Sequence, residues 1–290
     1  MDSLDLVRLS AVMERSRGSA DVVIALVDGP VAVNHPDLAA ARIRALDHDG
    51  ACALAGSYAC AHGTFVAGVL VGQRGSSAPA IAPDCTLLVS PIFGERASNQ
   101  RSMDGMPSAT PNELATAVRA AVDAGARVVN ISAALLHRAV GEERALTRAL
   151  DDAACRGTLV VAAAGNQALV GSSPLTRHPW VIPVAACDTE ARPSHSSNLG
   201  RSIGNGLLAP GERVVSLGTN GRPRTFSGTS AATPFVTGAI ALLCSLFPRA
   251  PGDLVRWALY RDRRRRRIVP PLLDAWGAYQ ALETRLSNLA

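Results

Sequence analysis

Short apolar runs rich in valine and isoleucine recur along this sequence and alternate with segments of helical character. Each run has the length of one strand and is rich in apolar residues: 22–27, 86–93, 127–132, 158–164 and 180–186. Helical segments over 113–124 and 142–156 are each followed by a glycine. Strands that alternate with helices favour βαβ units, and strands apolar on both faces are typical of a covered parallel sheet. We expect a three-layer α/β fold: a mainly parallel central sheet with helices on both faces.

The composition fits one large core in such a fold. Of the 290 residues, 48% are hydrophobic and 4% are aromatic, so alanine, valine, leucine and isoleucine must build the core. A chain of this length buries enough surface for one large domain. We predict an N-terminal helix, Leu4–Arg15, and a linker within residues 1–20. A single domain over residues 21–290 follows.

The charge and the hydropathy of the chain limit which kinds of partner it is expected to bind. The net charge is +5, and much of the excess lies in the arginine run 261–267. No aromatic residues interleave with that run, so a solvated loop is favoured over a nucleic-acid contact. The N-terminus carries acidic residues and lacks the apolar segment of a secretory signal, and no apolar run predicts a membrane span. We expect a cytoplasmic protein with no nucleic-acid and no membrane partner.

The six cysteines do not form a recognisable metal pattern. No Cys-x-x-Cys pair occurs, so a zinc site is not predicted, and we expect neither a metal ion nor a cofactor. In a reducing cytoplasm the thiols are expected to act as small apolar side chains. Cys52, Cys60 and Cys85 fall in one region and could pair under oxidising conditions.

Ser230 is the candidate nucleophile. It lies in the run Phe226–Phe235, where small residues surround Ser230 and an apolar helix follows to about Phe247. The preceding glycine lets the backbone turn tightly, which places the hydroxyl at the start of a buried helix. Pro234 is expected in the first turn of that helix, where its missing N–H costs nothing. Taken alone, a run of small residues is more often a packing feature.

Three more polar residues follow predicted strands or precede predicted helices. Asp28 comes directly after the strand 22–27, Asn166 follows the strand 158–164, and His62 precedes a helix of small residues. The carboxyl ends of parallel strands are where an α/β sheet places its chemistry. Each residue alone has a structural explanation: a turn cap for Asp28, or a hydrogen-bonded polar group for His62. Together, the order Asp, His, Ser matches one of the known orders of a serine-protease triad.

The sequence resembles the subtilisin-like (S8) serine proteases over nearly its whole length. The motifs that carry the resemblance are Val-Asp28-Gly-Pro, His62-Gly-Thr-Phe-Val-Ala-Gly, Val-Asn-Ile-Ser132, Ala-Ala-Gly-Asn166 and Gly-Thr-Ser230-Ala-Ala-Thr-Pro. The resemblance implies that Ser230 attacks a peptide carbonyl while His62 takes its proton. Asp28 would orient and stabilise the imidazole. The Asn166 side chain and the Ser230 backbone N–H would stabilise the oxyanion.

The same resemblance implies a substrate-binding surface. Ser132, Ala133 and Ala134 would form the edge that pairs with an extended peptide. Gly165 would line the pocket for the residue before the cleaved bond. With Gln167 nearby, the pocket is expected to be roomy and uncharged.

Departures from the family pattern point to one group of proteases within the family. Gly29 stands where most of the family has serine or threonine, and Phe65 replaces the usual histidine. The runs Ala-Cys-Ala-His-Gly-Thr, Ile-Ala-Pro-Asp-Cys and His-Pro-Trp-Val-Ile-Pro-Val resemble the PatA/PatG-type proteases of cyanobactin maturation. Those enzymes cut ribosomally made precursor peptides inside the producing cell. The segment between Asp28 and His62 is too short for the added lid of macrocyclising members, which points to hydrolysis. The loop 72–77 has no carboxylate, so no calcium site is predicted there.

Three alternative functions therefore remain. The first is a serine endopeptidase that processes a precursor peptide, with a peptide as its partner. The second is a general intracellular subtilase that degrades unfolded proteins. The third is an inactive subtilase-fold module that only binds peptides. Cleavage of one defined bond, of many unrelated bonds, or of none would distinguish them.

Overall fold

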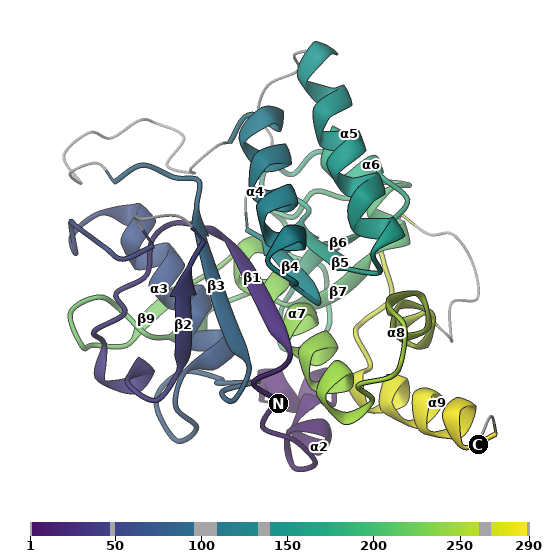
Figure 1. Ribbon diagram of the computed structural model, residues 1–290, viewed down its shortest axis with the longest axis horizontal. Helices are drawn as coiled ribbons and strands as arrows, with labels where there is room; N and C mark the ends of the chain where they lie inside the picture. The colour runs from purple at the N-terminus through teal and green to yellow at the C-terminus, as the bar shows by residue number, and fades with distance from the viewer. Residues whose placement is uncertain (1, 47–49, 96–108, 133–139, 261–267, 289–290) are drawn as a thin grey trace.

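A seven-stranded parallel sheet forms the centre of the protein in the computed structural model (Figure 1). The structure describes residues 2–46, 50–95, 109–132, 140–260 and 268–288. The strand order is β2-β3-β1-β4-β5-β6-β7. The bounds are β1 (Val23–Asp28), β2 (Arg42–Ala45), β3 (Thr86–Pro91), β4 (Val128–Ile131), β5 (Leu159–Ala163), β6 (Val181–Cys187) and β7 (Leu207–Pro210). A separate antiparallel pair joins β8 (Val214–Ser216) to β9 (Arg224–Phe226).

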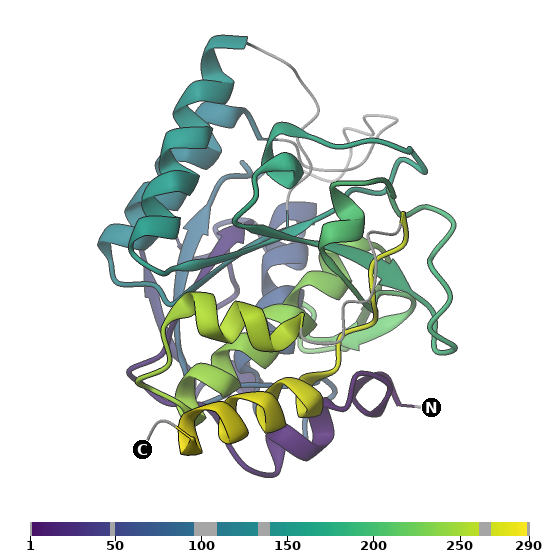
Figure 2. The same cartoon turned by 90° about the vertical axis from the view of Figure 1, so that its right-hand side faces the viewer.

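Helices cover both faces of the sheet (Figures 1 and 2). Their bounds are α1 (Ser3–Leu6), α2 (Leu9–Met13), α3 (Tyr58–Val71), α4 (Pro111–Asp123), α5 (Val140–Cys155), α6 (Pro174–Arg177), α7 (Thr229–Leu246), α8 (Gly252–Leu259) and α9 (Ala275–Ser287). Helices α4 and α5 lie on one face, and α3 and α7 lie on the other. Successive residues of β1 alternate between the two apolar cores, as the period of a strand requires. The predicted three-layer fold is confirmed.

Helix α7 is the core helix of the protein. Its residues from Thr229 to Cys244 are buried, and it packs against β4, β5, β6 and β7. The length and composition of α7 would allow it to cross a membrane, which the sequence analysis did not predict. However, 89% of the 18-residue span Thr229–Leu246 is buried inside the protein. The helix starts at Thr229, so Pro234 lies in its second turn and not in the first. Because proline lacks an N–H, the Ser230 carbonyl loses its intrahelical partner there.

The order of the strands reverses at β1. β3 lies on one side of it and β4 on the other, both parallel to it. In open parallel sheets, a crevice forms beyond the carboxyl ends of the strands at such a switch point. Asp28 ends β1, and Ser132 directly follows β4. The topology therefore brings polar residues from two neighbouring strands to one edge.

Several predicted element bounds differ from the structure. The expected helix Leu4–Arg15 is divided into α1 and α2, because Arg8 adopts a left-handed conformation with φ of 54°. That break lets the Val7 carbonyl accept the Ala275 N–H, which ties the N-terminal helices to α9 (Figure 2). Helix α4 is capped by Thr110 with a capping box to Glu113, so it begins two residues before the predicted start at 113.

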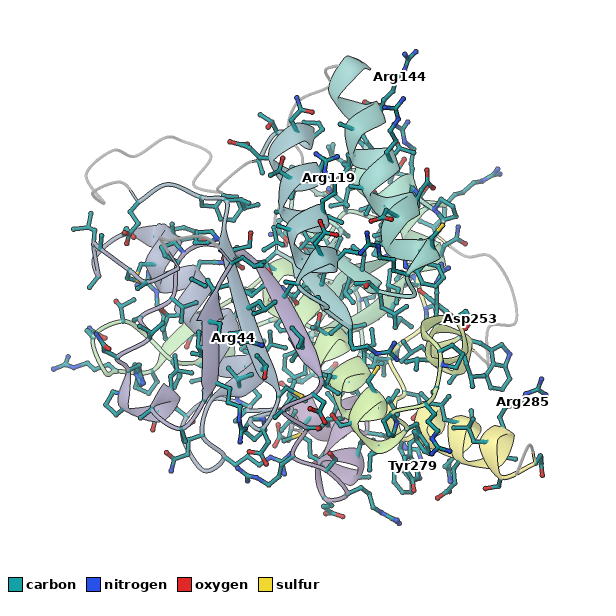
Figure 3. All side chains as sticks on the ribbon, in the orientation of Figure 1. Arg44, Arg119, Arg144, Asp253, Tyr279 and Arg285 are labelled. Carbon is teal, nitrogen blue, oxygen red and sulfur yellow. A yellow bond between two sulfur atoms is a disulfide. The ribbon has the colours of Figure 1, made fainter. Side chains whose placement is uncertain are left out.

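Charged side chains lie on the outer surface of this arrangement. Figure 3 shows Arg44 on β2, Arg119 on α4 and Arg144 on α5, all exposed. The arginine run 261–267, considered for nucleic-acid contact, lies outside the described residues. The division into an N-terminal segment and one domain remains a prediction.

Candidate active site

Asp28, His62 and Ser230 come together although they are far apart in the sequence. His62 Nδ1 lies 2.7 Å from Asp28 Oδ1, and His62 Nε2 lies 3.0 Å from Ser230 Oγ. Their relative exposures are 0%, 2% and 4%, so the three side chains are enclosed by protein. The imidazole bridges the carboxylate and the hydroxyl in the arrangement that activates a serine nucleophile.

Regular elements hold each of these residues. Asp28 ends β1, Ser230 is the second residue of α7, and His62 lies in the second turn of α3. We expected His62 to precede its helix. Instead, α3 begins at Tyr58, capped by the Ser57 hydroxyl, which accepts the Cys60 N–H. The histidine is therefore fixed by helical backbone on both sides.

Close packing at Gly29 explains one departure from the family pattern. A Cβ at this position would lie 2.1 Å from the carbonyl oxygen of Ala59 in α3. A serine or threonine is excluded because the first turn of α3 lies directly on this backbone. The Gly29 N–H donates to Asp28 Oδ1 at 2.6 Å, whereas Asp28 Oδ2 has no partner among the described residues.

Aromatic rings surround the imidazole on one side. Tyr58 stacks on His62 at 6.0 Å between ring centroids, and Phe226 meets the His62 ring edge-on at 5.5 Å. Phe65, fully buried, packs against Phe226 at 5.0 Å, which accounts for an aromatic residue in place of the usual histidine. Burial raises the pKa of the Tyr58 hydroxyl, and the Asp28 carboxylate raises it further. The rings restrict the orientation of the imidazole.

Asn166 lies beside Ser230 and is held through its oxygen. The Thr229 N–H donates to Asn166 Oδ1 at 2.8 Å, and the Thr229 hydroxyl donates to the same oxygen at 3.0 Å. With Oδ1 occupied, the amide Nδ2 remains to donate elsewhere. The Ser230 N–H, in the first turn of α7, has no hydrogen-bond partner within the described residues. These two donors form a candidate oxyanion-binding site.

Three of the five residues predicted to bind substrate lie within the described part of the chain. Ser132 is buried at the end of β4, where its hydroxyl accepts from the Asn130 side chain at 2.8 Å. Gly165 adopts φ of 102°, and its N–H donates to the Thr229 hydroxyl. Gln167 is exposed, and its side-chain oxygen accepts from Asn198 at 2.8 Å. Ala133 and Ala134 lie outside the described residues.

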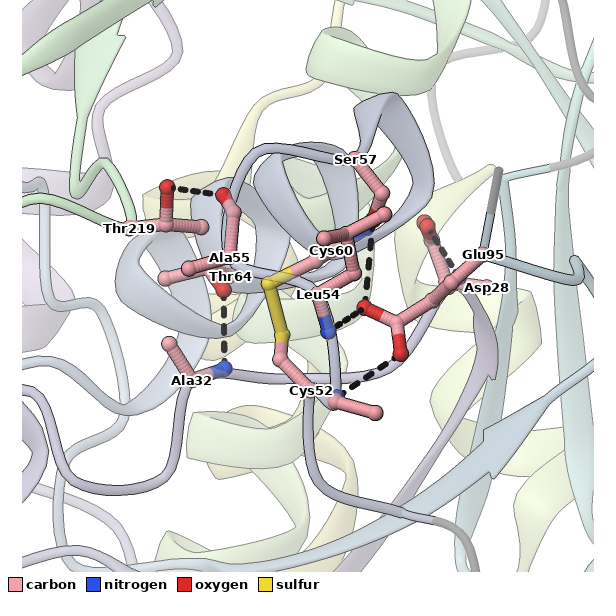
Figure 4. Close-up of a disulfide and its surroundings, with 12 residues drawn as sticks. Asp28, Ala32, Cys52, Leu54, Ala55, Ser57, Cys60, Thr64, Glu95 and Thr219 are labelled. Atoms are coloured by element: carbon pink, nitrogen blue, oxygen red, sulfur yellow. Dashed lines mark hydrogen bonds between the residues drawn. A yellow bond between two sulfur atoms is a disulfide. The ribbon is translucent and has the colours of Figure 1, made fainter. Parts of the chain in front are cut away.

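A disulfide joins Cys52 to Cys60, two residues before the candidate base (Figure 4). The expectation of free thiols is wrong for this pair, while Cys85 is free and buried. Around the disulfide, Glu95 accepts from the Ala53 N–H at 2.7 Å, the Leu54 N–H at 3.0 Å and the Ser57 hydroxyl at 3.1 Å (Figure 4). The disulfide and this carboxylate fasten the loop that precedes α3.

Glu95 and the two sulfur atoms lie within 4.8 Å of one another, which is a spacing that metal ligands share. Here the sulfur atoms are bonded to each other, and the carboxylate oxygens accept backbone and hydroxyl hydrogens. The group therefore acts as a structural clamp while the disulfide is intact. Sequence reasoning missed Glu95, because a lone glutamate before a polar stretch carries no local signal.

Comparisons with known proteins give a consistent result. The sequence matches the subtilase family (Peptidase S8) over residues 19–267. A thermophilic serine proteinase of Bacillus sp. (strain AK1) is 31% identical over 236 residues, which cover 79% of this chain. The chain spans about half of that relative, 54% of its length.

Two solved structures are similar over nearly their whole length. The protease domain of PatA superposes with a TM-score of 0.81 at 32% identity, over 92% of this chain and 97% of that one. The prenylagaramide maturation protease PagA gives a TM-score of 0.80 at 29% identity, over 94% of this chain and 98% of that one.

Proposed function

The chain belongs to the subtilase family of subtilisin-like serine proteases, and we propose that it hydrolyses one defined bond in a ribosomally made precursor peptide. The prediction of a serine endopeptidase is confirmed at the level of the family. The substrate and the roles of single residues are the proposal. The observation that carries them is the continuous chain of contacts from Asp28 through His62 to Ser230.

The proposed reaction starts with attack by Ser230 Oγ on the peptide carbonyl. His62 Nε2 takes the hydroxyl proton and later gives it to the leaving amine. Asp28 accepts the Nδ1–H, which fixes the tautomer and stabilises the imidazolium. Water then attacks the acyl-enzyme, with the same imidazole as the base.

The oxyanion of each tetrahedral intermediate would lie between Asn166 Nδ2 and the Ser230 N–H. Thr229 holds the amide oxygen of Asn166 through two hydrogen bonds, so the amide nitrogen needs little reorganisation when charge develops. The position of Ser230 in the first turn of α7 adds the positive end of a helix dipole.

Two similar proteins support a precursor peptide as substrate. PagA and PatA are described as maturation proteases, of prenylagaramide and of patellamide. Their similarity to this chain extends over nearly the full domain at about 30% identity, which is the support for a shared task. General degradation of unfolded proteins would require a site that accepts many sequences.

We also propose a cytoplasmic location, where a ribosomal precursor is made. The Cys52–Cys60 disulfide argues in the other direction, because structural disulfides are typical of oxidising compartments. Cell fractionation with antibody detection tests the location separately from the activity.

A peptide library tests the proposed substrate class. The purified protein is incubated with mixed peptides and with an unfolded protein, and the products are sequenced by mass spectrometry. Cleavage within one narrow sequence context, lost in Ser230→Ala, supports a processing enzyme. Cleavage at many unrelated bonds supports general degradation, and binding without cleavage supports a peptide-binding module.

A further inference from the structure

Asn198 connects two loops beside the candidate oxyanion site. It lies in the segment after β6 and is half-buried. Its side-chain nitrogen donates to the Ala164 carbonyl at 3.1 Å and to Gln167 Oε1 at 2.8 Å. Its side-chain oxygen accepts the Gln167 N–H at 3.1 Å and the Leu169 N–H at 3.0 Å. All four hydrogen bonds go to the loop that contains Asn166.

The backbone of Asn198 adds a fifth bond to the same loop. Its N–H donates to the Gly165 carbonyl at 2.8 Å. Asn198 therefore holds residues immediately before and after Asn166, and its hydrogen bonds to this loop go to those neighbours. Thr229 holds the Asn166 side chain, and Asn198 holds the backbone on which that side chain stands.

We propose that Asn198 is a positioning residue that fixes the oxyanion-binding amide of Asn166. The role requires a side chain that donates and accepts in one plane. An amide supplies two N–H donors and a carbonyl acceptor, which match the two acceptors and two donors found here. Alanine supplies none of these, and a hydroxyl can accept but supplies only one donor where two are used here.

Loss of this brace should act on the chemical step. The oxyanion exists only after attack, so an amide that is poorly placed weakens transition-state binding more than substrate binding. Displacement of such a group by about 1 Å can cost about 100-fold in rate. We expect Asn198→Ala to lower kcat by about 10-fold to 100-fold, with little change in KM.

A double-mutant cycle tests the inference, which rests on the proposed function. We would measure kcat per titrated active site for the parent, Asn198→Ala, Asn166→Ala and the double variant. If Asn198 acts through Asn166, the Asn198 change should lower kcat by less than about twofold once Asn166 is alanine. A purely structural role predicts that the two losses multiply, which would overturn the inference.

Controls separate this outcome from misfolding and from failure of the proposed function. Asn220→Ala is a matched control, because Asn220 also accepts a backbone N–H in an exposed turn but lies between β8 and β9. It should keep parental kcat. If Asn198→Ala does not fold, Asn198→Ser serves in the cycle, since its hydroxyl keeps one donor and can still accept a hydrogen bond. A parent without activity contradicts the proposed function, whereas an active parent with multiplying losses contradicts only the role of Asn198.

Discussion

The two halves of the candidate active site are held by different forces. On the imidazole side, Asp28 and His62 lie on a strand and a helix, are almost fully buried, and contact backbone and rings. On the oxyanion side, Asn166 is half-exposed; Thr229 holds its side chain by two hydrogen bonds, and Asn198 holds the residues on either side of it. Packing of regular elements thus fixes the residues proposed for proton transfer, whereas a polar network fixes the amide proposed to bind the oxyanion.

This difference predicts where substitutions should have their effects. A change in the packed half alters the relative placement of β1 and α3, so the free energy of unfolding should change. A change in the polar half leaves both cores intact and should lower kcat at nearly constant stability. The following changes are ordered from the largest expected effect to the smallest.

Asp28→Asn should give the largest loss that keeps the shape of the site. The amide cannot stabilise the imidazolium and favours the wrong tautomer of His62, so kcat should fall by about 10⁴-fold. Steady-state hydrolysis of a cleaved library peptide measures it. A loss below about tenfold would mean that the 2.7 Å contact has no catalytic role.

Asn166→Ala should lower kcat by about 10²-fold to 10³-fold through loss of one oxyanion donor. Because the side chain is half-exposed, the urea midpoint should stay close to that of the parent. Kinetics and urea unfolding on the same preparations check both halves of this prediction. A large drop in stability would contradict the division between packing and polar network.

Gly29→Ala should act mainly on stability. Its Cβ would lie 2.1 Å from the Ala59 carbonyl oxygen, so β1 and α3 must separate, at an expected cost of about 3 kcal/mol or more. The matched control is Gly56→Ala, since a Cβ at Gly56 meets no atom within 4 Å. Urea unfolding compares the two variants, and equal stabilities would contradict the packing argument.

Replacing Cys52 and Cys60 by serine should destabilise the protein by about 2–3 kcal/mol, because the short loop before α3 is no longer closed. Cys155→Ser is the control, since Cys155 is exposed and free. Thermal unfolding measures the difference. If both variants unfold at the temperature of the parent, the disulfide does not brace the packed half.

Alkaline pH should weaken the packing beneath the oxyanion loop. Burial raises the pKa of Cys187 from 9.0 to about 12, and Cys187 belongs to the same buried apolar cluster as Ala164. The folded state holds the proton more tightly, so stability is unaffected below pH 9 and falls as pH rises toward 12. We would measure the free energy of unfolding with urea at pH 8 and at pH 10.5. The decrease between these pH values should be about 1–2 kcal/mol smaller in Cys187→Ala than in the parent. An equal decrease in the two proteins would contradict the attribution of this alkaline destabilisation to Cys187.

The sequence predicted the strand ends that carry the candidate site because their signals are local. Apolar runs gave β1, β3, β4, β5 and β6, and the motifs around Asp28, His62, Asn166 and Ser230 identified the residues that the structure gathers. β2 and β9 were not predicted, because β2 is an edge strand with arginines on its exposed side and β9 is three residues long.

The supporting contacts were not predictable because they depend on tertiary placement. Glu95 and Asn198 lie in stretches without an apolar period, and their partners are 38–42 and 29–34 residues away in sequence. Tyr58 lies next to His62 only because α3 starts one turn earlier than its apolar pattern indicates. Such contacts require the fold before they can be recognised.

Covalent labelling of the nucleophile tests the central claim most directly. The folded protein is treated with a fluorophosphonate, digested, and analysed by mass spectrometry to locate the adduct. The geometry of Asp28, His62 and Ser230 predicts one adduct, on Ser230, that forms much more slowly in His62→Ala. An unlabelled folded protein, or equal labelling rates in the two proteins, would contradict it.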